Sequence, residues 1–117
     1  MSLAEQDCIF CKIVDKELPS DIVYEDDEIL AFKDVNPVAP IHILIIPKKH
    51  IPTLTDMGQE DAELIGRIHL AAGKIAESLG VYDRGFRLVN NCKDEGGQVV
   101  YHLHFHFLAG KKFKGVG

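Results

Sequence analysis

Hydrophobic residues along the chain follow two different periodicities. Between residues 59 and 79 they recur every three or four positions, which predicts one long amphipathic helix. Residues 8–14 have the same spacing over a shorter length and predict a short N-terminal helix. The remaining apolar runs are brief and rich in β-branched and aromatic residues, as expected of strands. They are residues 22–25, 29–33, 41–47, 86–90 and 99–108.

This order of elements predicts an α+β fold in a single domain of residues 1–117. We expect an antiparallel sheet of about five strands to pack against the long helix. Residues 41–47 are apolar almost throughout, which predicts a central strand that is buried on both faces. Thr55 or Asp56 is expected to cap the start of the long helix, and Gly80 stands where the helix should end.

The last predicted strand carries three of the six histidines, at alternate positions. Because a strand points successive side chains to opposite faces, His102, His104 and His106 should share one face. At roughly 3.3 Å per residue, His104 and His106 are about 7 Å apart and can reach one small ligand, whereas His102 and His106 are about 13 Å apart. The three imidazoles are therefore either metal ligands drawn together by strand twist, or a substrate-facing pair plus one histidine that serves another site.

Composition and charge restrict the class of partner. With 117 residues, 46% of them hydrophobic, the chain can bury one core without disulfide help. A net charge of −5 and the absence of a basic cluster argue against nucleic-acid binding. No apolar run approaches the roughly 20 residues of a membrane span, and the N-terminus has no apolar signal region. We therefore expect a cytoplasmic protein that binds neither membranes nor nucleic acid.

Two of the three cysteines form a Cys8-x-x-Cys11 pair. In an apparently cytosolic chain this pair is half of a zinc site, a redox motif, or two small half-buried hydrophobic residues. The redox interpretation requires a surrounding βαβ pattern, which is absent. Among the other polar candidates, Asp34 follows a strand and is either a ligand acceptor or a solvated turn residue. His42, alone in an apolar strand, is more often a structural donor than a catalytic group.

The segment Tyr-His-Leu-His-Phe-His-Phe-Leu at residues 101–108 resembles the signature of the histidine triad (HIT) nucleotide-binding family. The resemblance covers nearly the whole chain and is closest to its phosphoramidase-like (protein-kinase-C-inhibitor-like) branch, in the form that carries a Cys-x-x-Cys pair. The other matching segments are residues 8–13, 31–34, 40–42, 46–50, Asn91 and 96–98.

The resemblance implies a covalent mechanism. In the family the middle histidine, here His104, attacks the α-phosphorus of a nucleoside monophosphate derivative, and water then releases the nucleotide. An imidazole suits this role because it is a neutral nucleophile at pH 7. His106 is expected to contact the phosphate oxygens, and His42 to orient His104 or to donate a hydrogen bond to its surroundings.

The same resemblance implies the remaining contacts to the nucleotide. Asp34 is expected to bind the ribose hydroxyls. The apolar slot for the base is expected to be formed by Ile9, Phe10, Ile13 and Phe32. Hydrogen bonds to the phosphate are expected from Asn91, Gly97 and Gln98. These donors would stabilise the charge on the phosphate, so no catalytic metal is required. This chain has Val99 where the branch commonly has serine. Because valine cannot hydrogen-bond the leaving group, the leaving-group preference is open.

The resemblance also implies a structural zinc ion held by Cys8, Cys11, His50 and His102, which is a closed Cys₂His₂ set. It implies a homodimer with a continuous sheet, and a purine nucleoside monophosphate or its phosphoramidate as ligand. Three alternatives remain: a dinucleoside polyphosphate hydrolase, a non-catalytic nucleotide-binding scaffold, and a metalloenzyme whose metal is held by His42, His104 and His106.

Overall fold

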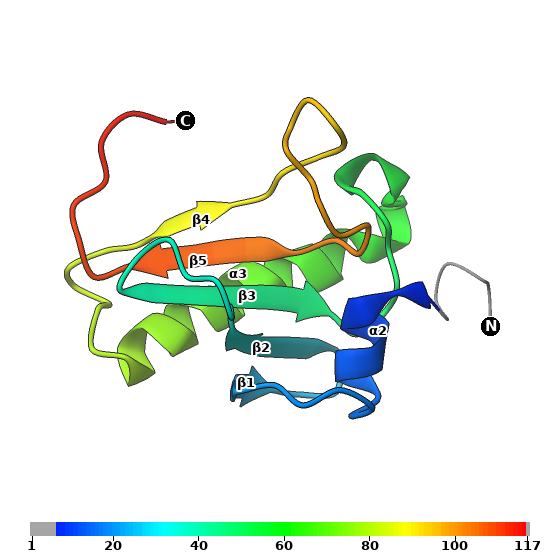
Figure 1. The fold of residues 1–117 in the computed structure, drawn as a ribbon, viewed down its shortest axis with the longest axis horizontal. Coiled ribbons are helices and arrows are strands. Elements are labelled where there is room, and N and C mark those ends of the chain that lie inside the picture. Colours follow the sequence, from blue (N-terminus) through cyan, green and yellow to red (C-terminus); the bar gives the residue numbers. More distant parts are fainter. Residues whose placement is uncertain (1–6, 117) are drawn as a thin grey trace.

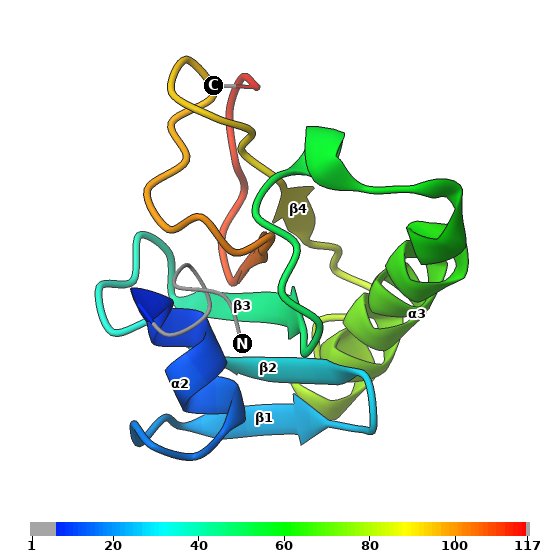
Figure 2. The same ribbon diagram turned by 90° about the vertical axis from the view of Figure 1, so that its right-hand side faces the viewer.

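A computed structural model describes residues 7–116 and contains one five-stranded antiparallel sheet with a helix on each face. The strand order is β1-β2-β3-β5-β4. The strands are β1 (Ile22–Glu25), β2 (Ile29–Lys33), β3 (Ile41–Pro47), β4 (Arg87–Val89) and β5 (Phe105–Ala109). Figure 2 shows α2 (Ile9–Val14) on one side of the sheet and α3 (Ala62–Ser78) on the other. The α+β prediction and its long and short helices are confirmed.

The central strand β3 divides the core into two clusters because its side chains alternate between the faces. Ile43 and Ile45 are buried against α3, whereas Leu44 and Ile46 belong to a second cluster on the side of α2. Burial on both faces, predicted from the continuous apolar run, is therefore confirmed. The α2 cluster contains Phe10 and Phe32, so this face of the sheet has an apolar wall.

The start of α3 differs from the prediction and its end agrees with it. Two short 3₁₀ helices, Leu54–Asp56 and Gln59–Asp61, precede α3, so neither Thr55 nor Asp56 caps it. Asp61 stands at the cap position instead, and its carboxylate accepts the backbone N–H of Gly58 at 3.0 Å. After α3, Gly80 has φ of +74°, a left-handed conformation that favours glycine and ends the helix as predicted. Among residues 7–116, no helix has the length and apolar character needed to cross a membrane.

The last strand is shorter than predicted. It begins at Phe105 and not at residue 99, and Val99 is 87% exposed. Alternation nevertheless continues before the strand, because Leu103, Phe105 and Phe107 all pack in the core against α3. Residues 102–104 are held mostly by contacts outside the regular sheet; for example, Leu103 donates its N–H to the carbonyl of Ile51 at 2.6 Å. The alternating hydrophobic pattern predicted which side of the sheet these side chains occupy. It did not predict where the backbone pairing of the strand begins.

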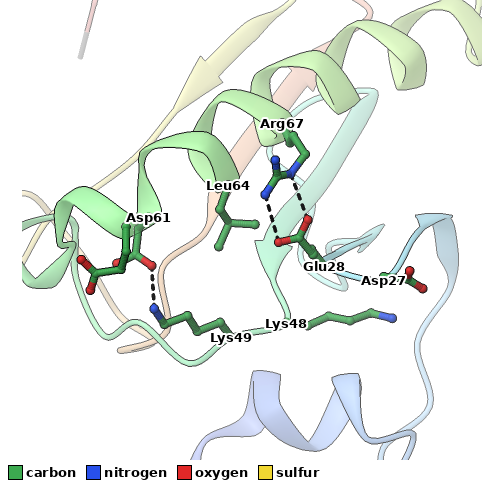
Figure 3. A pocket seen from close by; sticks show the side chains of 8 residues that line it. Asp27, Glu28, Lys48, Lys49, Asp61, Leu64 and Arg67 are labelled. Atoms are coloured by element: carbon green, nitrogen blue, oxygen red, sulfur yellow. Dashed lines mark hydrogen bonds and ion pairs between the residues drawn. The ribbon is translucent and has the colours of Figure 1, made fainter.

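A pocket of about 330 Å³ lies where the start of α3 meets the adjoining ends of β2 and β3 (Figure 3). Its charged side chains pair largely with one another. Arg67 on α3 bonds both carboxylate oxygens of Glu28, at 2.9 and 3.1 Å, and Lys49 bonds the buried carboxylate of Asp61 at 2.6 Å. The pocket therefore joins α3 to the sheet, and its charges are used in that junction.

Candidate active site

A larger cavity, of about 850 Å³, opens on the face of the sheet that carries α2. It crosses the sheet from the histidines near β5, past β3 and β2, to the residues just before β1. Nine of the predicted site residues line it: Ile9, Phe10, Ile13, Phe32, Asp34, His42, Val99, His104 and His106. The structure thus brings together the predicted base slot, the predicted ribose ligand and the predicted catalytic histidines in one cavity.

A hydrogen bond at one ring nitrogen holds the imidazole of His104 in place and leaves the other ring nitrogen unprotonated. Its Nδ1 lies 2.8 Å from the carbonyl oxygen of His102, so Nδ1 carries the proton and donates it to that oxygen. Nε2 of the neutral ring then keeps its lone pair. The edge of the Phe10 ring packs against the imidazole, with centroids 5.2 Å apart. Burial lowers the pKa of His104 below its ordinary value, against the opposing effects of the His102 carbonyl and Asp34.

His42 was expected to orient His104 or to donate a hydrogen bond to its surroundings, and in the structure its contact is with His106. The Nδ1 atom of His42 accepts the backbone N–H of Val38 at 3.1 Å, so its proton is on Nε2 when the ring is neutral. That Nε2 lies 2.9 Å from Nδ1 of His106 and 3.3 Å from Oδ2 of Asp34. Because Nδ1 of His106 accepts this hydrogen bond, the neutral ring of His106 carries its own proton on Nε2. The hydrogen bond therefore runs from His42 to His106, and the N–H at Nε2 of His106 is the remaining donor of the pair.

Burial keeps both of these imidazoles neutral. It is the largest cause that lowers the pKa of His106, to about 4, and the neighbouring His104 and His42 add to it. Burial also lowers the pKa of His42, and the nearby carboxylate of Asp34 opposes this shift. Asp34 itself is partly exposed, and its second oxygen, Oδ1, accepts the N–H of Asn36 at 2.8 Å. The hydrogen bond from Asn36 therefore orients the carboxylate of Asp34 where it lines the cavity.

The loop before the histidines is organised differently from the prediction. Asn91, Gly97 and Gln98 do not line the cavity. The side chain of Gln98 accepts the N–H of Lys93 and donates to the carbonyls of Pro52 and Val100.

Further contacts inside this loop use the other donors that we expected to bind phosphate. The backbone N–H of Gly97 donates to Asp94, and that of Gln98 to Lys93. Gly96 packs so closely that a Cβ there would collide with the backbone of Cys92. In this conformation the hydrogen-bonding groups of Gly97 and Gln98 fold the loop, and their binding of phosphate stays a prediction.

Sequence reasoning missed several residues of the cavity wall. They are Leu18, Pro19, Ser20, Asp21, Lys33, Val35, Asn36, Val38, Leu44 and Val100. Leu44 was predictable in principle, because alternation along β3 places it on the same face as His42. The others lie mainly in connecting segments, where no periodicity indicates the direction of a side chain.

A second cluster, of two cysteines and two histidines, lies beside the cavity. One ligand atom each from Cys8, Cys11, His50 and His102 lies within 4.8 Å of all the others. Sγ of Cys8 is 3.3 Å from Nδ1 of His102, and Sγ of Cys11 is 3.2 Å from Nδ1 of His50. Neighbouring sulfur and nitrogen ligands of one tetrahedral zinc ion are separated by about 3.5 Å. The four residues lie close enough to hold a metal ion.

The surroundings of His102 agree with this use. His102 is fully buried and its Nε2 donates to the carbonyl of Pro47 at 2.8 Å, which leaves the lone pair of Nδ1 facing the thiols. Nε2 of His50 is buried and has no hydrogen-bond partner among the described residues. Cys8 stands at the start of α2, so the cluster connects this helix to the sheet.

Comparisons with known proteins agree with one another. The family described as HIT domain matches residues 15–113. Purine nucleoside phosphoramidase of Escherichia coli is 49% identical over 106 residues, which are 91% of this chain and 89% of that protein. A HIT family hydrolase from Legionella pneumophila has a TM-score of 0.90 and 48% identity, covering 92% of this chain and 96% of that one. A histidine triad protein from Clostridium difficile has a TM-score of 0.92 and 52% identity, covering 95% and 96%.

Proposed function

Because the chain belongs to the HIT family, we propose that it hydrolyses purine nucleoside phosphoramidates and related nucleoside 5′-monophosphate derivatives through a nucleotidyl intermediate on His104. One observation carries this proposal. The hydrogen bond from Nδ1 of His104 to the His102 carbonyl leaves the Nε2 lone pair as the nucleophile of a neutral, buried ring. The 49% identity to a purine nucleoside phosphoramidase supports the choice of substrate class.

In the first step, Nε2 of His104 forms a bond to the α-phosphorus. The bond from phosphorus to the leaving nitrogen breaks, and its electron pair stays on that nitrogen. The departing nitrogen takes up a proton from solvent and leaves as the amine. His106 donates a hydrogen bond from Nε2 to a phosphate oxygen, since its Nδ1 is already occupied as an acceptor from His42. The His102 carbonyl stabilises the positive charge that develops on the His104 ring.

In the second step, water attacks the phosphorus and the bond to Nε2 of His104 breaks. One proton of the water passes to solvent, and His104 returns to its neutral form with the Nε2 lone pair restored. The Val38 N–H keeps the proton of His42 on Nε2 throughout, so His42 holds His106 in the orientation that both steps require. The products are the nucleoside monophosphate and the free amine.

The remainder of the cavity accommodates the nucleoside. We propose that Asp34 accepts hydrogen bonds from the ribose hydroxyls, because it carries the acidic carboxylate of the cavity wall nearest to the histidines. Phe10 and Phe32, which meet edge to face at 5.6 Å, form the wall of the base slot together with Ile9 and Ile13.

We further propose that Cys8, Cys11, His50 and His102 hold a structural zinc ion. Zinc supplies a crosslink between α2 and the sheet in this closed set of four ligands. The chemistry of phosphoryl transfer then depends on the histidines of the cavity alone. We also propose a homodimer that joins two sheets through the edge strand β4 and α3.

The tautomer of His42 argues against a catalytic metal at His42 and its neighbours. Asp34, His42 and His106 also lie within metal-binding distance of one another. A nitrogen can ligate a metal only with a free lone pair, and the Val38 N–H leaves the proton of neutral His42 on Nε2. The separation of 2.9 Å between His42 and His106 is that of a hydrogen bond.

The test is hydrolysis of adenosine 5′-phosphoramidate by the wild type and His104→Ala, with zinc content measured on both. We expect AMP release by the wild type, a loss of at least about 10³-fold in the variant, and the same zinc content. Retained activity in the variant contradicts the covalent mechanism. Faster cleavage of a diadenosine polyphosphate indicates a dinucleoside polyphosphate hydrolase, and AMP binding without turnover of either substrate indicates a scaffold.

A further inference from the structure

The main chain of His104 lies just beyond the end of the regular sheet. The pairing of β4 with β5 extends only to Val89 and His106, and the pairing of β3 with β5 ends at Ile45 and Phe105. His104 is the next residue outward, so neither ladder holds its carbonyl group. The side chain of Asn90, the first residue after β4, donates from Nδ2 to this carbonyl at 2.9 Å. A side chain therefore makes the hydrogen bond that strand pairing would otherwise supply.

The amide of Asn90 makes this one hydrogen bond and no other within residues 7–116. Its Oδ1 atom is buried and has no partner there. A buried acceptor without a partner destabilises the folded state, and such groups are uncommon in proteins. An apolar residue at this position avoids that penalty. The contact with His104 is thus the one favourable polar interaction that the side chain provides.

We infer that Asn90 is a positioning residue for the nucleophile, an inference that rests on the proposed role of His104. Two groups fix His104: the His102 carbonyl holds the ring at Nδ1, and Asn90 holds the backbone at the carbonyl oxygen. Asn90 does not line the cavity, so it acts on the reaction through His104. Without its donor, the peptide group between His104 and Phe105 can rotate, and Nε2 loses its alignment with phosphorus.

Two variants separate this role from a purely structural one. Asn90→Asp keeps the shape and removes the donor, and Asn90→Leu removes the donor together with the unpartnered Oδ1. Since a displacement of about 1 Å can lower a rate by roughly 10²-fold, we expect kcat to fall by about 10- to 100-fold in both. KM should stay within about twofold of the wild type, because the groups that bind the nucleotide are intact. Thermal unfolding of Asn90→Leu should remain close to that of the wild type.

The matched control is Gln59→Glu, which makes the same change from amide to acid at an exposed position in the 3₁₀ helix before α3. Its kcat should equal that of the wild type. A second measurement needs no turnover: the imidazole resonances of His104 in nuclear magnetic resonance spectra should shift in both Asn90 variants. The ring resonances of Tyr24, on the opposite edge strand β1, should not move.

The outcomes are distinct. Unchanged kcat and unchanged His104 resonances in both variants overturn the inference. A fall in kcat that accompanies a lower unfolding temperature and shifts in every histidine and in Tyr24 shows a general structural role, which also overturns it. If the wild type cleaves no phosphoramidate but the His104 resonances still shift selectively, the proposed function fails and the positioning role stands.

Discussion

Three histidines at or beside the cavity have one ring nitrogen assigned by the backbone. The Pro47 carbonyl accepts from Nε2 of His102, the His102 carbonyl accepts from Nδ1 of His104, and the Val38 N–H donates to Nδ1 of His42. Since the second nitrogen takes the opposite role in a neutral ring, these contacts decide which histidine can ligate, attack or donate. The same residue type therefore performs different tasks at neighbouring positions.

The lowered pKa values predict the pH dependence of activity. His42 and His106 act in their neutral forms, and burial lowers the pKa of both, to about 4 for His106. A histidine becomes protonated only as pH falls through its pKa, so both rings stay neutral below the ordinary value of about 6.5, and His106 does so until the pH approaches about 4. We expect kcat/KM of the wild type to remain level from about pH 8 to below pH 6. Initial rates across this range would contradict the account if they fell with a midpoint near pH 6.5.

The predictability of the site also differs from residue to residue. Alternation along residues 102–107 indicated that the three histidines share one face, opposite Leu103, Phe105 and Phe107, because a periodicity of two assigns faces from sequence alone. The partner of His42 could not be predicted in this way. His42 and His106 are 64 positions apart and meet only because β3 and β5 are neighbours in a particular register. Asn90 was missed for the same reason.

At the scale of helices and strands, the hydrophobic pattern predicted the positions of elements that are defined by the burial of local residues. It placed β1, β2 and β3 at their observed bounds and the end of α3 at Gly80, because each is set by local residues. It extended β5 too far, to residue 99. β-Propensity cannot show that the side chain of Gln98 binds the backbone of Pro52 and so shapes a loop where a strand was expected.

The connection between α2 and the Cys/His cluster predicts the effect of losing one of the proposed zinc ligands. Cys11→Ser should lower the zinc content and the unfolding temperature, because α2 then loses a crosslink to the sheet. KM should rise by roughly tenfold, because Phe10 on α2 lines the cavity at the proposed base slot. Metal analysis, thermal unfolding and steady-state kinetics measure these changes.

Cys92→Ser is the matched control for this experiment. Cys92 is a free thiol outside the cluster, so its replacement should leave the zinc content and KM unchanged. If Cys11→Ser retained a full equivalent of zinc, Cys11 would not be a ligand. If it lost zinc with no change in KM, the metal would not support the base slot.

In the molecule as a whole, the two faces of the sheet have different tasks. The face with α3 holds the larger core cluster, and the face with α2 holds the cavity and the Cys/His cluster. The sheet has two edge strands, β1 and β4. Large apolar side chains remain exposed on α3 and between α3 and β4, namely Leu70, Tyr82 and Phe86. Exposed apolar groups of this kind fit an interface between two copies of the chain.

The proposed homodimer predicts a change of mass in solution. Leu70 is 69% exposed on α3, and a charge there would have to be buried in an interface through this helix. We expect the wild type to sediment as a dimer and Leu70→Glu as a monomer. Gln59→Glu, with the same added charge outside the interface, should remain dimeric. A monomeric wild type, or a dimeric Leu70→Glu, would contradict the proposed interface.

The central claim is that Nε2 of His104 becomes bonded to phosphorus during the reaction. The most direct measurement is mass spectrometry of the protein quenched within its first turnovers on adenosine 5′-phosphoramidate, with the modified peptide sequenced. The account predicts an added adenylyl group on His104, which forms and decays at rates consistent with kcat. Turnover at full rate with no adduct at any time point, or an adduct on another residue, would contradict it.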